Sequence, residues 1–295
     1  MSWEELKLGE VCILNYGKNL PASKRQDGSV PVYSSAGQID FHSLPHVDSE
    51  GIIIGRKGSV GKIYFSDVPF FPIDTSYYII PDEKYNLKFL YYNIQILGLE
   101  DLNSDAAVPG LNRNNAYSQL INIPPLQTQK RIADILSAYD DLIENNLKRI
   151  KLLEQAAQNI YKEWFVNLRF PGHENTAIDE GSGLPEGWQE VLMEDVMNVS
   201  GGGTPSTKEP LYWEEGKVLW FSPTDLNKNN SLVLIDSTKK ITELGLKKSS
   251  AKLLPQRTIL MSSRATIGLF GLFNGECATN QGFININPKE ESLRY

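Results

Sequence analysis

The stretch that decides the fold is residues 126–168, LQTQKRIADILSAYDDLIENNLKRIKLLEQAAQNIYKEWFVNL. Its apolar residues recur at alternating steps of four and three, and neither proline nor glycine interrupts them, so the pattern predicts one long helix with an apolar seam. Pro124 and Pro125 suit the approach to a helix and its first turn, and Pro171 blocks continuation at the far end. At 1.5 Å per residue this helix would be roughly 60 Å long.

The predicted seam contains a single polar residue among apolar ones. A seam this long exceeds one ordinary globular unit, and a lone Asn in a seam commonly fixes register, so we expect the helix to pair with a second helix as a coiled coil. A helix that simply packs on a sheet is the alternative. The seam positions are Ile132, Leu136, Tyr139, Ile143, Asn146, Ile150, Leu153, Ala157, Ile160 and Trp164.

Composition narrows the class of protein. The 295 residues favour about two domains, and no apolar run or leader predicts a membrane span or a secretion signal. Cys12 and Cys277 are too few for a disulfide framework and favour a reducing cytoplasm, while the three histidines lack the spacing of a zinc site. The formal net charge of −7 argues against gripping nucleic acid by bulk electrostatics. A role with DNA therefore requires local basic patches or a basic partner.

The segment before the long helix is predicted to be one domain of mixed α and β structure, and a Gly-, Glu- and Asp-rich linker is predicted after the helix. In the first domain we expect strands at residues 30–34, 51–55, 61–66 and 77–81, a helix at 88–97 and a polar loop at 103–115. The predicted organisation is a first domain at 1–122, a spacer helix at 123–170, a linker at 171–187 and a second domain at 188–295.

Three phrases of the first domain return in the second domain in the same order. This recurrence predicts two copies of one globular unit, and the second copy is expected to be incomplete because its small helix and its long helix are missing. The matched phrases are 3–11 with 188–196, 52–61 with 259–268, and 72–79 with 277–284.

Together these phrases resemble the specificity subunit of type I restriction-modification enzymes. The most specific piece is IPPLQTQKRIA at 123–133, and the Trp-led openings, the GGGTPS phrase at 201–206 and the two strand-turn-strand phrases accompany it. The resemblance covers nearly the whole chain. It implies an α+β fold with two similar mixed α/β target-recognition domains, held apart by a pair of long antiparallel helices, each reading one half of a split DNA site. The chain departs from the family in lacking the second long helix.

The same resemblance implies a subunit that is not itself a catalyst. It implies partners that are methyltransferase subunits, which carry S-adenosylmethionine and methylate adenine, and through them a restriction and translocase subunit that uses ATP and Mg. No cofactor is expected in this chain. It is expected in the bacterial cytoplasm, away from membranes, on double-stranded DNA.

The turn GRKGSVG at residues 55–61 concentrates two cations, a hydroxyl and three glycines between two predicted strands. Such a turn can bring backbone N–H groups to a phosphate, while Arg56 or Lys57 reaches another phosphate or pairs with guanine in the major groove. A tight hairpin with solvated charges is the alternative. The matching turn in the second copy keeps Arg264, so we interpret Arg56 and Arg264 as a shared pair and Lys57 as a residue that differs between the copies.

Polar residues that follow these turns carry hydrogen-bonding groups suited to base edges, and Asn280 or Gln281 can pair bidentately with adenine; turn capping is an equally weighted alternative. Arg113, just before the long helix, is a candidate for phosphate contact or docking. The glycine run at 201–203 has no Lys-Ser/Thr pair after it and is predicted to be a flexible turn. The candidate DNA-binding residues are Arg56, Lys57, Ser59, Thr75, Ser76, Arg113, Ser263, Arg264, Thr266, Asn280 and Gln281.

The sequence contains no pattern of a catalytic site. It has no glycine-rich S-adenosylmethionine loop, no Asn/Asp-Pro-Pro-Tyr/Phe tetrad for methylating a base, and no paired-carboxylate or Ser/His/Asp arrangement. We therefore predict a non-catalytic subunit that recognises a bipartite DNA site. The alternatives are a truncated subunit that forms a homodimer through its long helix, a coiled-coil scaffold with no DNA role, and a self-contained methyltransferase.

Overall fold

The computed structural model describes residues 3–102, 110–229, 231–264 and 266–290. The chain divides into two compact units, Met1–Asn146 and Leu147–Tyr295, and the division falls within the long helix α4 (Leu126–Tyr161). None of the helices in the described ranges is both long and apolar enough to cross a membrane.

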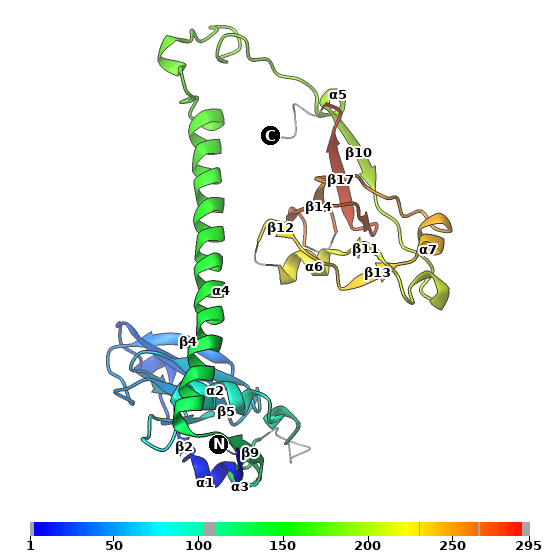
Figure 1. Cartoon of the computed structure of the whole chain (residues 1–295). Helices are drawn as coiled ribbons and strands as arrows, with labels where there is room; N and C mark the ends of the chain where they lie inside the picture. Colours follow the sequence, from blue (N-terminus) through cyan, green and yellow to red (C-terminus); the bar gives the residue numbers. More distant parts are fainter. Residues whose placement is uncertain (1–2, 103–109, 230, 265, 291–295) are drawn as a thin grey trace. The chain divides into compact units, whose positions relative to one another are not determined.

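The first unit is built on two small sheets and a separate strand pair (Figure 1). The four-stranded sheet is antiparallel throughout and has the order β2-β8-β5-β6. Its strands are β2 (Asn15–Tyr16), β5 (Gly51–Gly55), β6 (Ile63–Ser66) and β8 (Ser76–Ile79). The other sheet has the order β4-β3-β7, with β3 (Val30–Ser34), β4 (Gly37–His42) and β7 (Phe71–Pro72), and β1 (Glu4–Lys7) pairs with β9 (Leu120–Ile123).

The predicted strands at 30–34 and 51–55 are confirmed to the residue, and the other two differ only at their ends. The run GIIIG of β5 is buried along its whole length. Ile52 and Ile54 pack in the core that α2 (Leu87–Gln95) closes, whereas Ile53 points to the opposite face and packs with Val47 and Phe70. Because successive strand residues face opposite sides, an unbroken apolar run is what a strand buried on both faces requires.

The segment predicted to be a polar loop at 103–115 is partly helical. Residues 103–109 lie outside the described residues, but Arg113–Tyr117 forms the short helix α3. The Asn112 side chain accepts hydrogen bonds from the backbone N–H groups of Asn114 and Asn115, and Ala116 is buried. The cluster of asparagines predicted a loop, but asparagine is also a preferred residue at the start of a helix, so the same residues can cap one. Helix α1 (Leu8–Val11) lies against α3.

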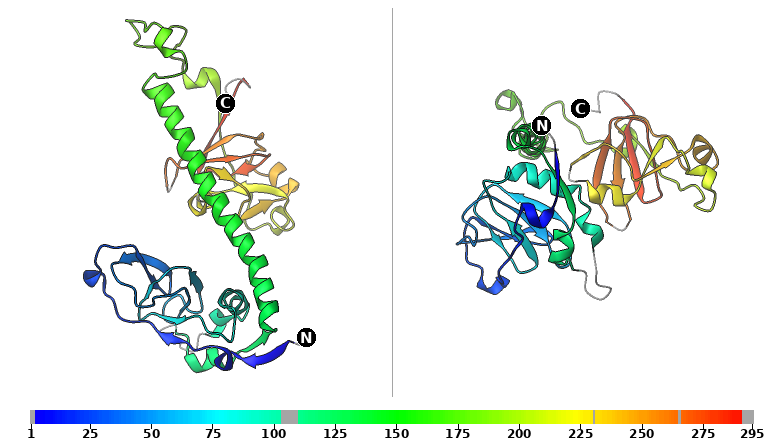
Figure 2. Two further views of the ribbon diagram at one scale, coloured as in Figure 1. Left: turned by 60° about the vertical axis from the view of Figure 1, so that its left-hand side comes forward. Right: turned by 60° about the horizontal axis from the view of Figure 1, so that its bottom comes forward.

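Helix α4 confirms the long helix predicted from the seam, and it runs without a break in the left view of Figure 2. A π-helical turn at Lys162–Val166 extends it to within two residues of the predicted end. Its start is tied to the first unit by Gln129, which is buried. The Gln129 amide donates to the Pro124 carbonyl at 2.8 Å and accepts from the Asn86 backbone N–H at 2.9 Å.

Beyond its first turns α4 is exposed. Seam residues Tyr139, Ile143 and Leu153 are 64%, 57% and 68% exposed. Apolar side chains along the seam therefore face solvent, as expected of a coiled-coil helix whose partner helix is absent. The predicted coiled-coil partner stays a prediction.

The second unit repeats the topology of the first. Its larger sheet has the order β10-β17-β14-β15-β12, which matches β2-β8-β5-β6 with one added edge strand, and its smaller sheet β13-β11-β16 matches β4-β3-β7. The strands are β10 (Met197–Gly201), β11 (Val218–Phe221), β12 (Val233–Leu234), β13 (Lys239–Ile241), β14 (Ile259–Ser262), β15 (Phe270–Phe273), β16 (Ala278–Thr279) and β17 (Phe283–Pro288). The short helices are α5 (Met193–Val196), α6 (Pro223–Lys228) and α7 (Glu243–Lys247). The predicted internal repeat is therefore a repeat of structure.

The register of the repeat differs from the sequence match in one place. The cross-strand pairs that define it are Ile52↔Ile79 and Gly55↔Ser76 in the first unit, and Ile259↔Ile286 and Ser262↔Phe283 in the second. Residues 72–79 therefore correspond to 279–286, and the match with 277–284 is wrong by two positions. Small polar residues recur in both phrases, so residue type alone is compatible with more than one alignment. The hydrogen bonds between the strands define a single register.

Candidate nucleic-acid interface

The turn between β5 and β6 is held by its own backbone. Gly58 and Gly61 have φ values of +84° and +71°, and the Gly61 N–H donates to the Gly55 carbonyl at 2.9 Å. The N–H groups of Arg56 and Lys57 both donate to the Thr75 carbonyl, at 2.9 and 3.1 Å. These two N–H groups are therefore satisfied within the fold, so a ligand of this turn would be bound by the side chains of Arg56 and Lys57 and not by their backbone N–H groups.

Those side chains meet two tyrosines and a second arginine. The guanidinium carbons of Arg56 and Arg113 lie 5.1 and 5.0 Å from the centre of the same ring, that of Tyr16. The Arg56 guanidinium also lies 5.9 Å from the Tyr77 ring, and the two tyrosine rings are 5.1 Å apart. A guanidinium at such a distance from a ring is attracted by the electrons of the ring face. We call this group, with Lys57, the first-unit cation pocket.

The pocket is a cavity of about 410 Å³. It brings together residues from β2, the β5–β6 turn, β8 and the start of α3, which are far apart in the sequence. Arg56, Lys57 and Arg113 were all predicted as candidate contacts, and the structure places them around one cavity. Tyr16 and Tyr77 were missed, because a tyrosine in a strand is ordinary and only the fold shows that these two rings meet.

The described residues around the pocket do not balance its positive charge. Among the described residues no carboxylate forms an ion pair with Arg56, Lys57 or Arg113. Burial raises the pKa of Tyr77 to about 12, against the pull of the two arginines, and its hydroxyl donates to the Leu111 carbonyl at 3.1 Å. Tyr77 is therefore neutral at physiological pH and adds no negative charge to the three cations of the pocket.

Two of the other predicted residues of the first unit, Ser76 and Thr75, form hydrogen bonds within the fold. Ser76 is fully buried, and its hydroxyl donates to the Ile73 carbonyl at 2.8 Å, so it caps the turn before β8 and does not reach the surface. The Thr75 hydroxyl oxygen accepts from the Ser35 N–H at 3.3 Å. Ser59 is half-buried within its turn. For Ser76 the structure therefore supports turn capping, which was the alternative to a contact with DNA.

The matching turn of the second unit has different chemistry. The Gly268 N–H donates to Ser262 as Gly61 does to Gly55, which places Ser263 at the position of Arg56 and Arg264 at the position of Lys57. The prediction that Arg56 and Arg264 form a shared pair is therefore wrong, since the register pairs Arg264 with Lys57. Arg264 itself is exposed.

Neutral polar groups surround this second turn. The Asn227 amide donates to the Thr266 hydroxyl at 3.2 Å, and the Thr204 hydroxyl donates to the Gln281 amide oxygen. Gln281 is exposed, whereas the Asn280 side chain accepts from the Gly282 N–H at 2.8 Å and so caps its own turn.

The glycine run of the second unit was predicted to be a flexible turn, but two of its glycines are tightly packed. A Cβ at Gly202 would lie 2.0 Å from the Asn280 carbonyl oxygen, so the backbone at Gly202 packs directly on the neighbouring turn. Gly203 is packed as tightly, with the Ala251 nitrogen 2.3 Å from such a Cβ. Gly202 and Gly203 thus serve close backbone packing.

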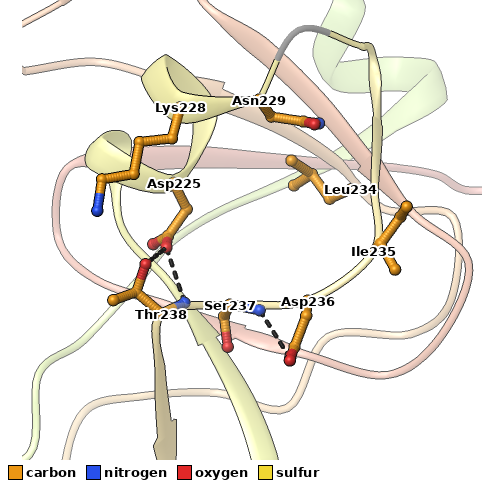
Figure 3. Close-up of a pocket in the computed structure, with 8 residues that line it drawn as sticks. All are labelled: Asp225, Lys228, Asn229, Leu234, Ile235, Asp236, Ser237 and Thr238. Atoms are coloured by element: carbon orange, nitrogen blue, oxygen red, sulfur yellow. Dashed lines mark hydrogen bonds between the residues drawn. The ribbon is translucent and has the colours of Figure 1, made fainter. Parts of the chain in front are cut away.

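A cavity of about 330 Å³ beside α6 contains an acidic residue with a structural role (Figure 3). The Asp225 carboxylate accepts from the N–H and hydroxyl of Thr238, at 2.9 and 2.5 Å, and from the N–H and hydroxyl of Ser222, both at 2.7 Å. Burial acts to raise the pKa of Asp225, but these hydrogen bonds outweigh it and the pKa lies below its usual value. Four accepted hydrogen bonds leave this carboxylate little capacity for a ligand.

The cysteines and the potential metal ligands give no further candidate site within the described residues. Burial raises the pKa of both Cys12 and Cys277 to about 12, so both thiols are protonated at neutral pH. Within the described residues no group of three His, Cys, Asp or Glu side chains is placed to hold a metal ion.

Comparison with known proteins matches most of the chain. The family model described as "Type I restriction modification DNA specificity domain" matches residues 1–155 and 185–295. The MjaIX specificity subunit of Methanocaldococcus jannaschii is 28% identical over 215 residues, which cover 71% of this chain and 49% of that protein. The HindI specificity subunit of Haemophilus influenzae is 23% identical over 240 residues, which cover 62% of this chain and 52% of that protein. The chain thus spans about half the length of these curated relatives.

A solved structure shares the fold. The crystal structure of a type I restriction-modification S subunit from M. genitalium matches with a TM-score of 0.63 at 18% identity, covering 100% of this chain and 74% of that chain. The predicted fold class, two similar mixed α/β units with a long helix, is confirmed by this likeness and by the repeated topology.

Proposed function

Since the chain belongs to the family of type I restriction-modification DNA specificity proteins, we propose that it recognises double-stranded DNA and leaves catalysis to partner subunits. The first-unit cation pocket carries this proposal. In a chain whose formal net charge is −7, three cations that have no ion-pair partner among the described residues surround one cavity and form a local attraction for an anionic polymer.

The two units give the proposal its finer form. They have the same topology but unlike side chains at equivalent turns, which suits two readers of different half-sites in a bipartite target. The predicted domains at 1–122 and 188–295 would each read one half, with residues 123–170 as a spacer. Methyltransferase subunits would carry S-adenosylmethionine and supply most of the phosphate neutralisation that the acidic chain lacks, and a restriction subunit would bind through them.

The proposal predicts sequence-restricted protection of DNA. Assembled with methyltransferase subunits, the full chain should protect a limited set of sequences in a footprint on a random duplex pool, and added salt should weaken the protection. Calorimetric titration of the isolated chain with S-adenosylmethionine should show no heat of binding. Absence of protection by the assembled complex would favour a scaffold without a DNA role, and heat of binding would favour a methyltransferase.

The exposed seam of α4 favours a second arrangement, in which the chain pairs with a copy of itself. Apolar seam residues are open to solvent along several turns, and Asn146 is the one polar residue among the predicted seam positions. In a coiled coil of two such helices each helix would cover the seam of the other. This arrangement is compatible with DNA recognition and would place two copies of the first unit in one assembly.

Polar substitutions along the seam test the pairing. The triple variant Leu136→Gln, Ile143→Gln and Ile150→Gln should convert a dimer to a monomer, because each change places an amide in the apolar contact between helices. Light scattering after size exclusion, at micromolar concentration, measures the mass. The exposed substitutions Lys148→Gln and Lys151→Gln, which lie on α4 outside the seam, are the control. A monomeric wild-type chain would rule out the homodimer and leave DNA recognition standing.

A further inference from the structure

We propose that the first-unit cation pocket binds one DNA phosphodiester, and that the second unit has no equivalent site. The inference rests on the proposed function and deepens it, because it assigns the sequence-independent grip on DNA to one of the two units.

The arginines of the pocket have hydrogen-bond donors to spare. Their guanidinium groups contact aromatic rings, and no hydrogen bond from either guanidinium to a described residue is present in the structure. A guanidinium carries five N–H donors in its plane, and contact with a ring face leaves those edges available. Arg56 and Arg113 are half-buried, so part of the cost of removing water from them has already been met by folding.

The arrangement suits an anion better than a base edge. Reading a guanine needs one guanidinium aligned with two acceptors, whereas here two guanidiniums share the Tyr16 ring and Lys57 lines the same cavity. The two guanidinium groups on the Tyr16 ring repel each other, and an anion bound between them would offset this repulsion. A phosphodiester supplies one negative charge and acceptor oxygens that match guanidinium donors. Tyr16 and Tyr77 thus act as positioning residues for the two arginines.

The second unit lacks the parts from which this pocket is built. Tyr16 pairs with Tyr77 across β2 and β8, and the equivalent cross-strand pair of β10 and β17 is Gly201 with Ile284. Ser263 stands where Arg56 does in the first unit. Only Arg264 is cationic there, and neither ring is present to hold it, so the polar groups around that turn are neutral amides and hydroxyls.

The salt dependence of DNA binding tests the proposal. The assembled complex should be titrated into a fluorescein-labelled random-sequence duplex between about 50 and 200 mM salt. The double variant Arg56→Gln and Arg113→Gln should reduce the magnitude of the negative slope of log affinity against log salt by about one to two. It should also weaken binding roughly 10- to 100-fold at the low-salt end. Sequence preference in the footprint should not change, because a phosphate contact carries no base information.

Two further variants separate charge from fold. Lys24→Gln with Lys84→Gln removes the same charge from exposed positions of the same unit and should leave the slope unchanged. Arg56→Lys with Arg113→Lys keeps both charges and should retain most of the slope. Circular dichroism would show whether the glutamine pair unfolds the unit. In that case the test is the triple variant Arg56→Lys, Arg113→Lys and Tyr16→Leu, which keeps both charges and should still reduce the magnitude of the slope.

Several outcomes would overturn the proposal. An unchanged slope in a folded glutamine pair would remove the pocket from the DNA interface, and an altered sequence preference with an intact slope would make these arginines base readers. Heat on titrating the isolated chain with millimolar inorganic phosphate would point to a free phosphate ligand instead. Failure of the wild-type complex to bind any duplex would instead count against the proposed function, so the two failures are distinguishable.

Discussion

Replacing Gly17 with alanine is expected to destabilise the first unit by roughly 3 kcal/mol or more. An added Cβ would lie 2.0 Å from the Ile73 carbonyl oxygen and 2.7 Å from the Pro72 carbonyl oxygen, and both are backbone atoms that cannot swing away. The Lys18 N–H donates to the same Pro72 oxygen at 2.9 Å, so the two segments cannot separate without losing that bond. Since Tyr16 is the preceding residue, the change should also disturb the cation pocket.

The second unit offers a matched pair of glycines for this prediction. Gly202 is the structural equivalent of Gly17, and its added Cβ would lie 2.0 Å from the Asn280 carbonyl oxygen. A Cβ at the adjacent Gly201 would meet nothing within 4 Å. Gly202→Ala should therefore loosen the second unit, and Gly201→Ala should be tolerated. Hydrogen exchange followed by mass spectrometry locates each effect, and equal protection in the two variants would contradict the packing argument.

Replacing Asp225 with asparagine is expected to cost the second unit about 2–3 kcal/mol at neutral pH. The carboxylate accepts four hydrogen bonds from Ser222 and Thr238, and it also caps the start of α6. An amide replaces one acceptor oxygen with a donor that faces N–H and hydroxyl groups. Those groups would then lose their partners in a buried position, which is the costly outcome for a hydrogen-bonded pair.

The pH dependence of this contribution has a definite sign. The pKa of Asp225 is lower in the folded unit than its usual value, so its stabilisation is complete above the unfolded pKa of about 4 and is lost as the pH falls through the folded value. Thermal unfolding of the wild-type chain and of Asp225→Asn should therefore converge as the pH is lowered. Asp236→Asn, at an exposed carboxylate paired with Lys240, is the control and should change stability much less. A constant difference at every pH would contradict the assignment.

Much of the fold was predictable because the pattern of apolar residues depends on local geometry. The GIIIG run predicted β5 to the residue, since a strand buried on both faces needs an unbroken apolar run. The seam of α4 was visible for the same reason, because only a helix places residues at steps of three and four on one face. The candidate cations Arg56 and Arg113 were also visible, as charges next to glycines and asparagines in loops.

The errors share one cause, which is that residue type does not report which segments meet. The two-residue displacement at 277–284 came from matching similar short phrases, whereas the cross-strand hydrogen bonds define a different register. The pairing of Arg56 with Arg264 came from residue type alone, although the match of 52–61 with 259–268 already sets Arg264 opposite Lys57. Ser76 looked like a surface hydroxyl and is a buried turn cap.

The sequence alone determined that this protein has two copies of one unit and a long helix, because strand and helix periodicity are written in neighbouring residues. Only the tertiary structure decided that Tyr16, Arg56, Tyr77 and Arg113 surround one cavity, and that Gly201 and Ile284 stand at the positions of the two tyrosines in the second unit. The physical reason is that backbone hydrogen bonds set Tyr16 beside Tyr77 and Leu111 beside Arg56, residues that are 61 and 55 positions apart in the chain, and such contacts leave no periodic trace in the sequence.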